Sequence, residues 1–296
     1  MPLRPAMELI ARARTEGYAV GYFESWNLES LQGVIDAAEE SRSPILIGFN
    51  GEFLSSSGRL TSERLSWYAG LGQAAAASAK VPCGLILNEC SNDGWIRQAV
   101  DLGFSLVMPD DAGAAPDDFA RRVAELVRYA HGHGAAVEAE IGRLPCGASG
   151  RVSDTGAGLT DPEEAAHFVR ATGIDVLGLS VGNVHIMLRG SQGLDIGHLA
   201  AVRERVAVPF DLHGGTGITS DSLHEAIRLG VAKVCYGTYV KQRYLRALRK
   251  TLGSEEPNPH KCLGYGGAGD VLVAGRLAVK EAVLERIGWL GCCGKA

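Results

Sequence analysis

The sequence predicts an α/β protein, a (β/α)8 TIM barrel with a C-terminal helical extension. Eight short apolar segments, each bounded by Gly, Pro or polar residues, alternate with amphipathic segments of helical periodicity. Eight strand and helix units in about 240 residues fit a closed barrel, whereas a doubly wound sheet needs only about six strands. No GxGxxG motif follows the first apolar segment, which argues against a dinucleotide-binding fold.

The expected strands are short, buried and parallel. They cover residues 18–23, 44–50, 83–89, 105–110, 136–142, 176–182, 209–214 and 232–237. Asn27 predicts the N-cap of a helix that follows the first strand. We expect one domain over residues 1–296, in which residues from about 254 onward form the extension. That extension begins Gly-rich and continues as one long helix to Leu290.

Composition narrows the expected partners. The chain has 296 residues, of which 46% are hydrophobic and 21% charged, and its formal net charge is −5. It has no basic run, so nucleic acid is not an expected partner, and no segment reaches the ~20 apolar residues of a membrane span. The N-terminal segment is typical of a charged helix rather than a signal peptide, so a cytoplasmic protein is expected. Seven scattered cysteines without a CxxC pair argue against a disulfide framework or a zinc ribbon.

Polar residues stand where several predicted strands end. In a barrel the carboxyl ends of all strands meet at one mouth, where catalytic residues gather. The residues expected there are Asn88, Glu89, Asp110, Glu138, Glu140, His185, His213 and Thr238. Glu140 is preferred to Glu138 as functional, because the two share a strand face and Glu140 lies nearer the mouth. A structural role is the alternative for Glu89 and Asp110, because a carboxylate at the start of a helix interacts favourably with the positive end of that helix.

Two histidines and a glycine-rich turn suggest the chemistry of this mouth. His185 and His213 with one or more carboxylates form a divalent-metal set, in which catalytic zinc commonly keeps three protein ligands and one open position. Such a metal polarises a carbonyl oxygen and stabilises an enediolate. The segment "HGGTG" offers backbone N–H groups and a following helix N-terminus, which suit an anion, although a plain tight turn is the alternative. A phosphate is therefore expected near Gly214, Gly215, Thr216 and Thr238.

Several segments along nearly the whole chain act as landmarks. They are "YAVGYF" followed by "NLE", "SPILIG", "AVDLGFSLVM", "VEAEIG", "GNVH", "LHGGTGI" and "GRLAVK…GKA". Together they resemble the class II, metal-dependent ketose-bisphosphate aldolases of the fructose- and tagatose-bisphosphate type. The resemblance implies a TIM barrel, a catalytic zinc ion held by three histidines, a phosphorylated sugar or keto substrate, and a homodimer or homotetramer.

The resemblance also implies roles for individual residues. His185 and His213 match two of the family's three zinc histidines. Asp110 and Glu140 match its auxiliary or second-metal carboxylates, and Arg276 matches an arginine used for the distal phosphate of a bisphosphate. The implied substrate- and phosphate-binding residues are Asn27, Gly182, Gly214, Gly215, Thr216, Thr238 and Arg276.

The chain departs from the family pattern at the end of the third predicted strand. Where the family reads His-x-Asp-His, residues 86–89 read Ile-Leu-Asn-Glu. The Asn88 amide does not titrate near neutral pH, so it cannot replace the family's proton-transferring Asp. Glu89 is expected to replace the missing histidine ligand, with zinc as the first choice of metal and Mg or Mn as alternatives. Cys235 and Ile186 replace a family Asn and Gly, which adds to the argument against ordinary fructose-bisphosphate aldolase activity.

Three functions fit these observations. The first is an aldolase-like lyase that makes or breaks a C–C bond in a phosphorylated ketose or related keto compound through a metal-stabilised enediolate. Its predicted catalytic residues are Asn88, Glu89, Asp110 and Glu140, and its metal ligands are His185, His213 and Glu89. The second is a metal-dependent epimerase, isomerase or biosynthetic condensing enzyme on the same scaffold. The third is a non-catalytic binding protein.

Overall fold

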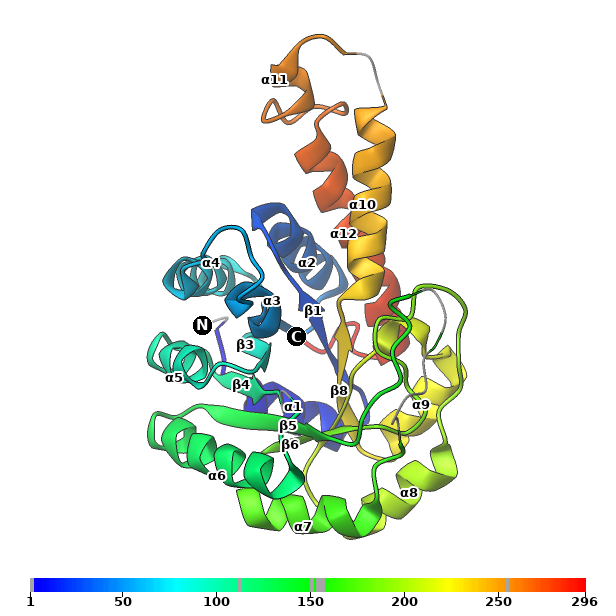
Figure 1. Ribbon diagram of the computed structural model, residues 1–296. Coiled ribbons are helices and arrows are strands. Elements are labelled where there is room, and N and C mark those ends of the chain that lie inside the picture. The colour runs from blue at the N-terminus through cyan, green and yellow to red at the C-terminus, as the bar shows by residue number, and fades with distance from the viewer. Residues whose placement is uncertain (1–2, 111–112, 150–151, 153–157, 254–255) are drawn as a thin grey trace.

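The computed structural model describes residues 3–110, 113–149, 152, 158–253 and 256–296 (Figure 1). Its centre is a closed barrel of eight parallel strands in sequence order, with β8 paired to β1. The strands are β1 (Val20–Glu24), β2 (Ile45–Asn50), β3 (Cys83–Cys90), β4 (Leu106–Pro109), β5 (Ala136–Ile141), β6 (Val176–Leu179), β7 (Phe210–Leu212) and β8 (Val231–Tyr236). Each strand starts within two residues of its predicted start and ends within three residues of its predicted end. The predicted TIM barrel is therefore confirmed.

Helices surround the barrel (Figure 1). They are α1 (Ala6–Glu16), α2 (Leu28–Ser41), α3 (Gly51–Ser55), α4 (Leu65–Ser78), α5 (Asp93–Asp101), α6 (Pro116–Gly132), α7 (Pro162–Thr172), α8 (Ile196–Arg205), η1 (Gly215–Gly217), α9 (Ser220–Arg228), α10 (Thr238–Leu252), α11 (Pro259–Cys262) and α12 (Val271–Leu290). The predicted N-cap is confirmed, because the Asn27 side chain accepts from the Ser30 backbone N–H and the Ser30 hydroxyl accepts from that of Asn27. Within the described ranges, no helix is long and apolar enough to cross a membrane.

The C-terminal extension ends in the predicted long helix, α12, which closes at Leu290. This helix packs against α2 and α10, and its residues Val279, Val283 and Ile287 are fully buried. Figure 1 shows α10 and α12 running side by side away from the barrel, with the short α11 at their far end. The part of the extension near the barrel therefore belongs to the hydrophobic core, and only its far end projects.

Strand periodicity places charged side chains inside the barrel. Residues two apart on a strand point to the same face, so β5, β8, and β7 with the residue that follows it each contribute a stacked pair. The lower residues of these pairs are Glu138, Asp211 and Lys233, and the upper ones are Glu140, His213 and Cys235. The three lower side chains are fully buried. An ionic layer therefore lies directly beneath the residues at the mouth.

Candidate active site

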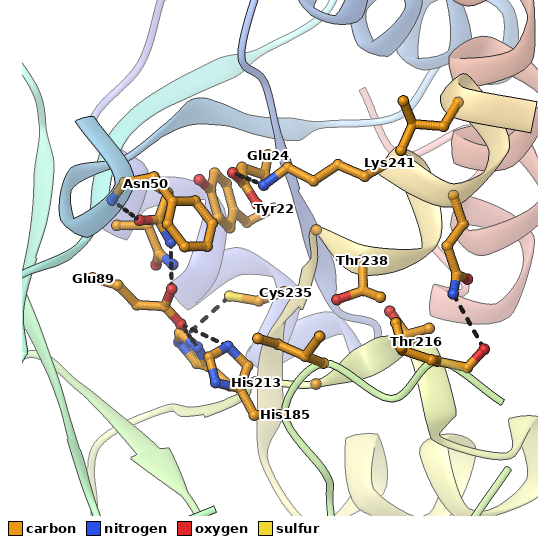
Figure 2. Close-up of a pocket in the computed structure, with 18 residues that line it drawn as sticks. Tyr22, Glu24, Asn50, Glu89, His185, His213, Thr216, Cys235, Thr238 and Lys241 are labelled. Carbon is orange, nitrogen blue, oxygen red and sulfur yellow. Dashed lines mark hydrogen bonds and ion pairs between the residues drawn. The ribbon is translucent and has the colours of Figure 1, made fainter. Parts of the chain in front are cut away.

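A cavity of about 260 Å³ opens at the mouth formed by the strand ends (Figure 2). Its lining residues come from β1, β2, β3 and β8, from the loops that follow β6 and β7, and from α3 and α10. They are Tyr22, Glu24, Asn50, Phe53, Asn88, Glu89, His185, Ile186, Leu188, His213, Gly214, Thr216, Cys235, Gly237, Thr238, Lys241, Gln242 and Leu245. The predicted mouth thus exists, and it combines polar strand ends with an apolar rim.

Glu89 and the two histidines converge at the floor of this cavity. The Glu89 Oε1 atom lies 2.6 Å from His213 Nδ1 and 3.5 Å from His185 Nε2. The other carboxylate oxygen accepts a hydrogen bond of 2.5 Å from the Asn50 side-chain amide. Burial alone would raise the pKa of Glu89, but His213, His185 and the Asn50 hydrogen bond outweigh burial and lower it to about 2. Glu89 is therefore a carboxylate at neutral pH, held facing both imidazoles.

The backbone conformation at Glu89 determines where this carboxylate points. Its φ of 46° lies in the left-handed region, and the pairing of β3 with β4 shifts register between Leu87 and Cys90. A regular strand would have kept side chains 88 and 89 on opposite faces. Because the strand is bulged here, both Asn88 and Glu89 line the same cavity. Backbone strain of about 1–3 kcal/mol at such a position is typical of functional sites.

His213 is held rigidly, whereas His185 is more open. The His213 backbone carbonyl accepts a hydrogen bond of 2.9 Å from Asn183, a buried residue of the loop after β6. The His185 side chain is 42% exposed, and its backbone N–H and carbonyl bond to residues 145 and 147. Gly214, with φ of 70°, lets the two histidine-bearing loops approach, since a Cβ there would lie 2.2 Å from the Val184 carbonyl oxygen. Sequence analysis did not identify the Asn183 contact.

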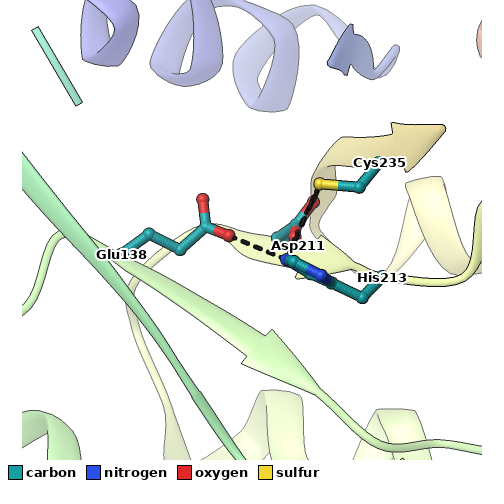
Figure 3. Close-up of side chains that lie close together, drawn as sticks. All are labelled: Glu138, Asp211, His213 and Cys235. Atoms are coloured by element: carbon teal, nitrogen blue, oxygen red, sulfur yellow. Dashed lines mark hydrogen bonds and ion pairs between the residues drawn. The ribbon is translucent and has the colours of Figure 1, made fainter. Parts of the chain in front are cut away.

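A second, deeper cluster of potential metal ligands is drawn in Figure 3. It joins His213 and Cys235, which line the cavity, to the fully buried Glu138 and Asp211. One ligand atom each from Glu138, Asp211, His213 and Cys235 lies within 4.8 Å of the others. The Lys233 ammonium lies among them, 2.9 Å from Glu138 Oε2, 3.2 Å from Asp211 Oδ2 and 2.9 Å from Cys235 Sγ. Burial raises the pKa of the Cys235 thiol to about 12, so this side chain is not a thiolate. This cluster therefore already contains a cation, and it shares only His213 with the predicted metal set.

The structure brings many of the predicted site residues together. Those that line the cavity are Asn88, Glu89, His185, His213, Gly214, Thr216 and Thr238. Thr216 and Thr238 lie on one side of it, apart from Asn50 and Glu89 (Figure 2). The Thr216 hydroxyl accepts from the backbone N–H of Tyr239, and Thr238 begins α10. The predicted anion turn thus adjoins the N-terminus of a 15-residue helix.

The other predicted residues lie elsewhere. Asn27 caps α2 and donates through its side chain to the Tyr244 hydroxyl, and Arg276 makes a two-point ion pair of 2.6 and 2.8 Å with Asp36. Gly182 and Gly215 are not among the residues that line the cavity. Asp110 follows β4, and its carbonyl accepts from Arg122. Glu140 lines a separate cavity with Phe119 and His167, and burial raises its pKa to about 8.

Several cavity residues were not predicted from the sequence, among them Lys241 and Asn50. Lys241 lies in the first turn of α10, and its ammonium donates to Glu24 over 2.5 Å. Asn50 is the last residue of β2, so the rule applied to other strand ends could have found it. Two buried polar atoms in the cavity, Tyr22 Oη and Asn88 Oδ1, have no hydrogen-bond partner among the described residues. Such orphaned atoms indicate a site whose polar ligand completes the hydrogen bonds.

Ile186, next to His185, has a strained backbone. Its φ of 53° is a genuine outlier for a β-branched residue. Ile186→Gly is expected to leave the free energy of unfolding unchanged or to raise it by about 1 kcal/mol, because relief of strain offsets the lost side chain. Ile141→Gly, at a partly buried strand end with ordinary φ, should instead lower it by about 2 kcal/mol. Urea denaturation of both variants checks this, and equal losses would contradict the strain at Ile186.

A parallel barrel whose strand ends gather imidazoles, carboxylates and an anion turn around one cavity is typical of a TIM-barrel enzyme. The family described as fructose-bisphosphate aldolase class-II matches residues 4–295. The chain therefore belongs to the class II fructose-bisphosphate aldolase family, a family of lyases.

Individual relatives match over their full length. The chain is 31% identical to the fructose-bisphosphate aldolase of Geobacillus stearothermophilus, in an alignment that covers 100% of this chain and 99% of that protein. It is also 31% identical to the fructose-bisphosphate aldolase of Thermus caldophilus, with 98% of each covered. The crystal structure of the YdjI aldolase from Escherichia coli K12 superimposes with a TM-score of 0.81 at 30% identity, covering 99% of both chains.

Proposed function

We propose that this protein is an aldolase-like lyase that makes or breaks a C–C bond in a phosphorylated ketose or related keto compound. The observation that carries the proposal is the approach of His185 and His213 to one oxygen of Glu89, beside an anion turn. Family membership supports the lyase class and a phosphorylated sugar as substrate. The altered pair Asn88 and Glu89 argues for a reaction other than ordinary fructose-bisphosphate cleavage.

The donor set at the mouth fits a divalent metal ion. Two imidazoles and one carboxylate are an accepted zinc set, and the carboxylate also suits Mg or Mn. The deeper cluster is less suited to this role, since the Lys233 ammonium already compensates its carboxylates. When bound by Glu89, His185 and His213, the metal would polarise the substrate carbonyl and stabilise an enediolate.

The remaining steps fall to residues of the chain itself. Thr216, Thr238 and the N-terminus of α10 bind the phosphate and thereby orient the substrate. The Asn88 amide, with its unpaired buried oxygen, bonds to a substrate hydroxyl but cannot carry a proton. Glu140 is a less well placed general base than a carboxylate at position 88 would be, because its pKa of about 8 lies near neutral pH but its side chain does not line the cavity.

Removing a proposed ligand should remove the metal together with the activity. His185→Ala is expected to abolish stoichiometric zinc binding and to lower C–C cleavage or condensation about 10³-fold, since the metal supplies several kcal/mol of transition-state stabilisation. Elemental analysis of the purified protein and assays with dihydroxyacetone phosphate and aldehydes measure both effects. His224→Ala, at an exposed position of α9, is the matched control and should change neither.

Two other outcomes would redirect the proposal. Metal binding with isomerised products only would favour an epimerase or isomerase, which uses the same enediolate chemistry. Wild type that binds no divalent metal and turns over no phosphorylated ketose would contradict the proposal and favour a binding protein.

We also propose a homodimer or homotetramer. The proposal is supported by exposed apolar residues near the far end of the extension, such as Leu252, Leu263 and Tyr265.

A further inference from the structure

The cavity contains one ion pair that the proposed chemistry does not use, Glu24 with Lys241. Glu24 is the last residue of β1 and is only 7% exposed, and Lys241 is the only lysine or arginine among the described residues that line the cavity. Their charged atoms lie 2.5 Å apart. Figure 2 shows this pair well apart from Thr216, on the side of Tyr22 and Asn50. The pair therefore faces a different part of a substrate than the anion turn does.

The surroundings hold this pair in place. The Lys241 ammonium lies 4.4 Å from the ring centroid of Phe53 and 5.7 Å from that of Trp26, which are cation–π distances. The Glu24 carboxylate packs closely against Gly237, the residue that follows β8. This contact requires glycine, because a Cβ at position 237 would lie 2.4 Å from Glu24 Oε2. The pair is thus a fixed feature of the wall rather than a surface contact, and its two charges cancel.

Among the residues that the structure describes, this end of the cavity offers no free cation to a second phosphate. Lys241 is already neutralised by Glu24, and Arg276, the arginine implied for a distal phosphate, is engaged by Asp36 outside the cavity. A phosphate dianion near Lys241 would also face the buried Glu24 carboxylate, and like charges brought together in a desolvated site repel. This part of the cavity wall therefore disfavours a doubly phosphorylated substrate.

Neutral hydroxyl groups fit the same wall. The Glu24 carboxylate accepts hydrogen bonds and the Lys241 ammonium donates them, so together they match adjacent hydroxyls of a sugar chain. Phe53, Leu188 and Leu245 supply apolar surface for its C–H groups. Resting on the proposed function, we infer that Glu24 and Lys241 determine specificity for a ketose monophosphate, whose carbonyl half is phosphorylated and whose distal half is an unphosphorylated polyhydroxy chain.

Equilibrium binding tests this without requiring turnover. Fructose 1-phosphate and fructose 1,6-bisphosphate are titrated calorimetrically into the zinc-loaded protein. Wild type is expected to bind the monophosphate at least tenfold more tightly. Glu24→Gln should shift the ratio of the two dissociation constants at least tenfold toward the bisphosphate, because it frees the Lys241 charge. Lys241→Met should weaken both ligands and not favour the bisphosphate.

The partly exposed pair Glu40 with Lys280, outside the cavity, supplies matched controls. Glu40→Gln and Lys280→Met are the same chemical changes on α2 and α12 and should leave both dissociation constants unchanged. Preference of wild type for the bisphosphate, or a ratio that Glu24→Gln does not move, would overturn the inference while leaving the proposed function intact. Failure of wild type to bind either phosphate ester would instead contradict the proposed function itself.

Discussion

Lys233→Met is expected to lower the free energy of unfolding by about 3–5 kcal/mol, as removal of one partner from a buried ion pair typically does. The wild-type ammonium lies 2.9 Å from Glu138 and 3.2 Å from Asp211, and all three side chains are fully buried. Methionine fills a similar volume but leaves the two carboxylates with only the His213 imidazole, 3.0 Å from Asp211 and 3.3 Å from Glu138, as a partner in a desolvated layer. Urea denaturation followed by circular dichroism measures the loss.

The penalty should depend on pH. Burial and the neighbouring Asp211 already raise the pKa of Glu138, and loss of Lys233 removes the charge that opposed this shift. A carboxyl whose folded pKa lies above its unfolded value of about 4.3 loses stability as pH rises through the folded pKa. The variant should therefore be destabilised more at pH 8 than at pH 5.

Two further variants make this prediction specific. Lys280→Met breaks the partly exposed pair with Glu40 and should cost less than about 1 kcal/mol. Adding Asp211→Asn to Lys233→Met should recover part of the loss, because one buried charge is removed. A loss below 1 kcal/mol in Lys233→Met, or no recovery in the double variant, would mean that the ionic layer contributes little to stability.

The sequence predicts the barrel well because the signal is local. Each apolar run is bounded by turn residues, and eight such runs allow few arrangements other than a closed parallel sheet. The same reasoning places Asn88, Glu89, His185 and His213 at one mouth without any contact being known. Residues far apart in the chain could thus be assembled from topology alone.

Side-chain partners lie beyond that reasoning. Lys233 meets Glu138 only because barrel stagger puts the two strands in the right register, and no local pattern encodes this. Arg276 has a partner, Asp36, that requires the packing of α12 on α2 to be known. The left-handed backbone at Glu89 was also unpredictable, since neither its residue type nor its neighbours favour it.

Asn88→Asp should raise the rate of ketose-phosphate cleavage by about 10²–10⁴-fold, the usual contribution of a general acid–base. Asn88 lines the cavity beside the proposed metal ligand Glu89, and its Oδ1 atom is buried without a partner among the described residues. Aspartate has nearly the same shape, so it places a titratable oxygen where the amide stood. Steady-state assays of cleavage with bound zinc confirmed in each preparation measure the gain.

Asn92→Asp is the matched control, because Asn92 caps α5 outside the cavity and aspartate is an equally good N-cap. Its cleavage rate should equal that of wild type. If Asn88→Asp retains metal and fold but gains no cleavage, the missing carboxylate is not what limits this barrel, and the proton must move through another group such as Glu140. If it gains cleavage while losing an isomerase or condensation activity present in wild type, the amide itself had selected that other reaction. Either result fixes the role of residue 88 in the chemistry at the mouth.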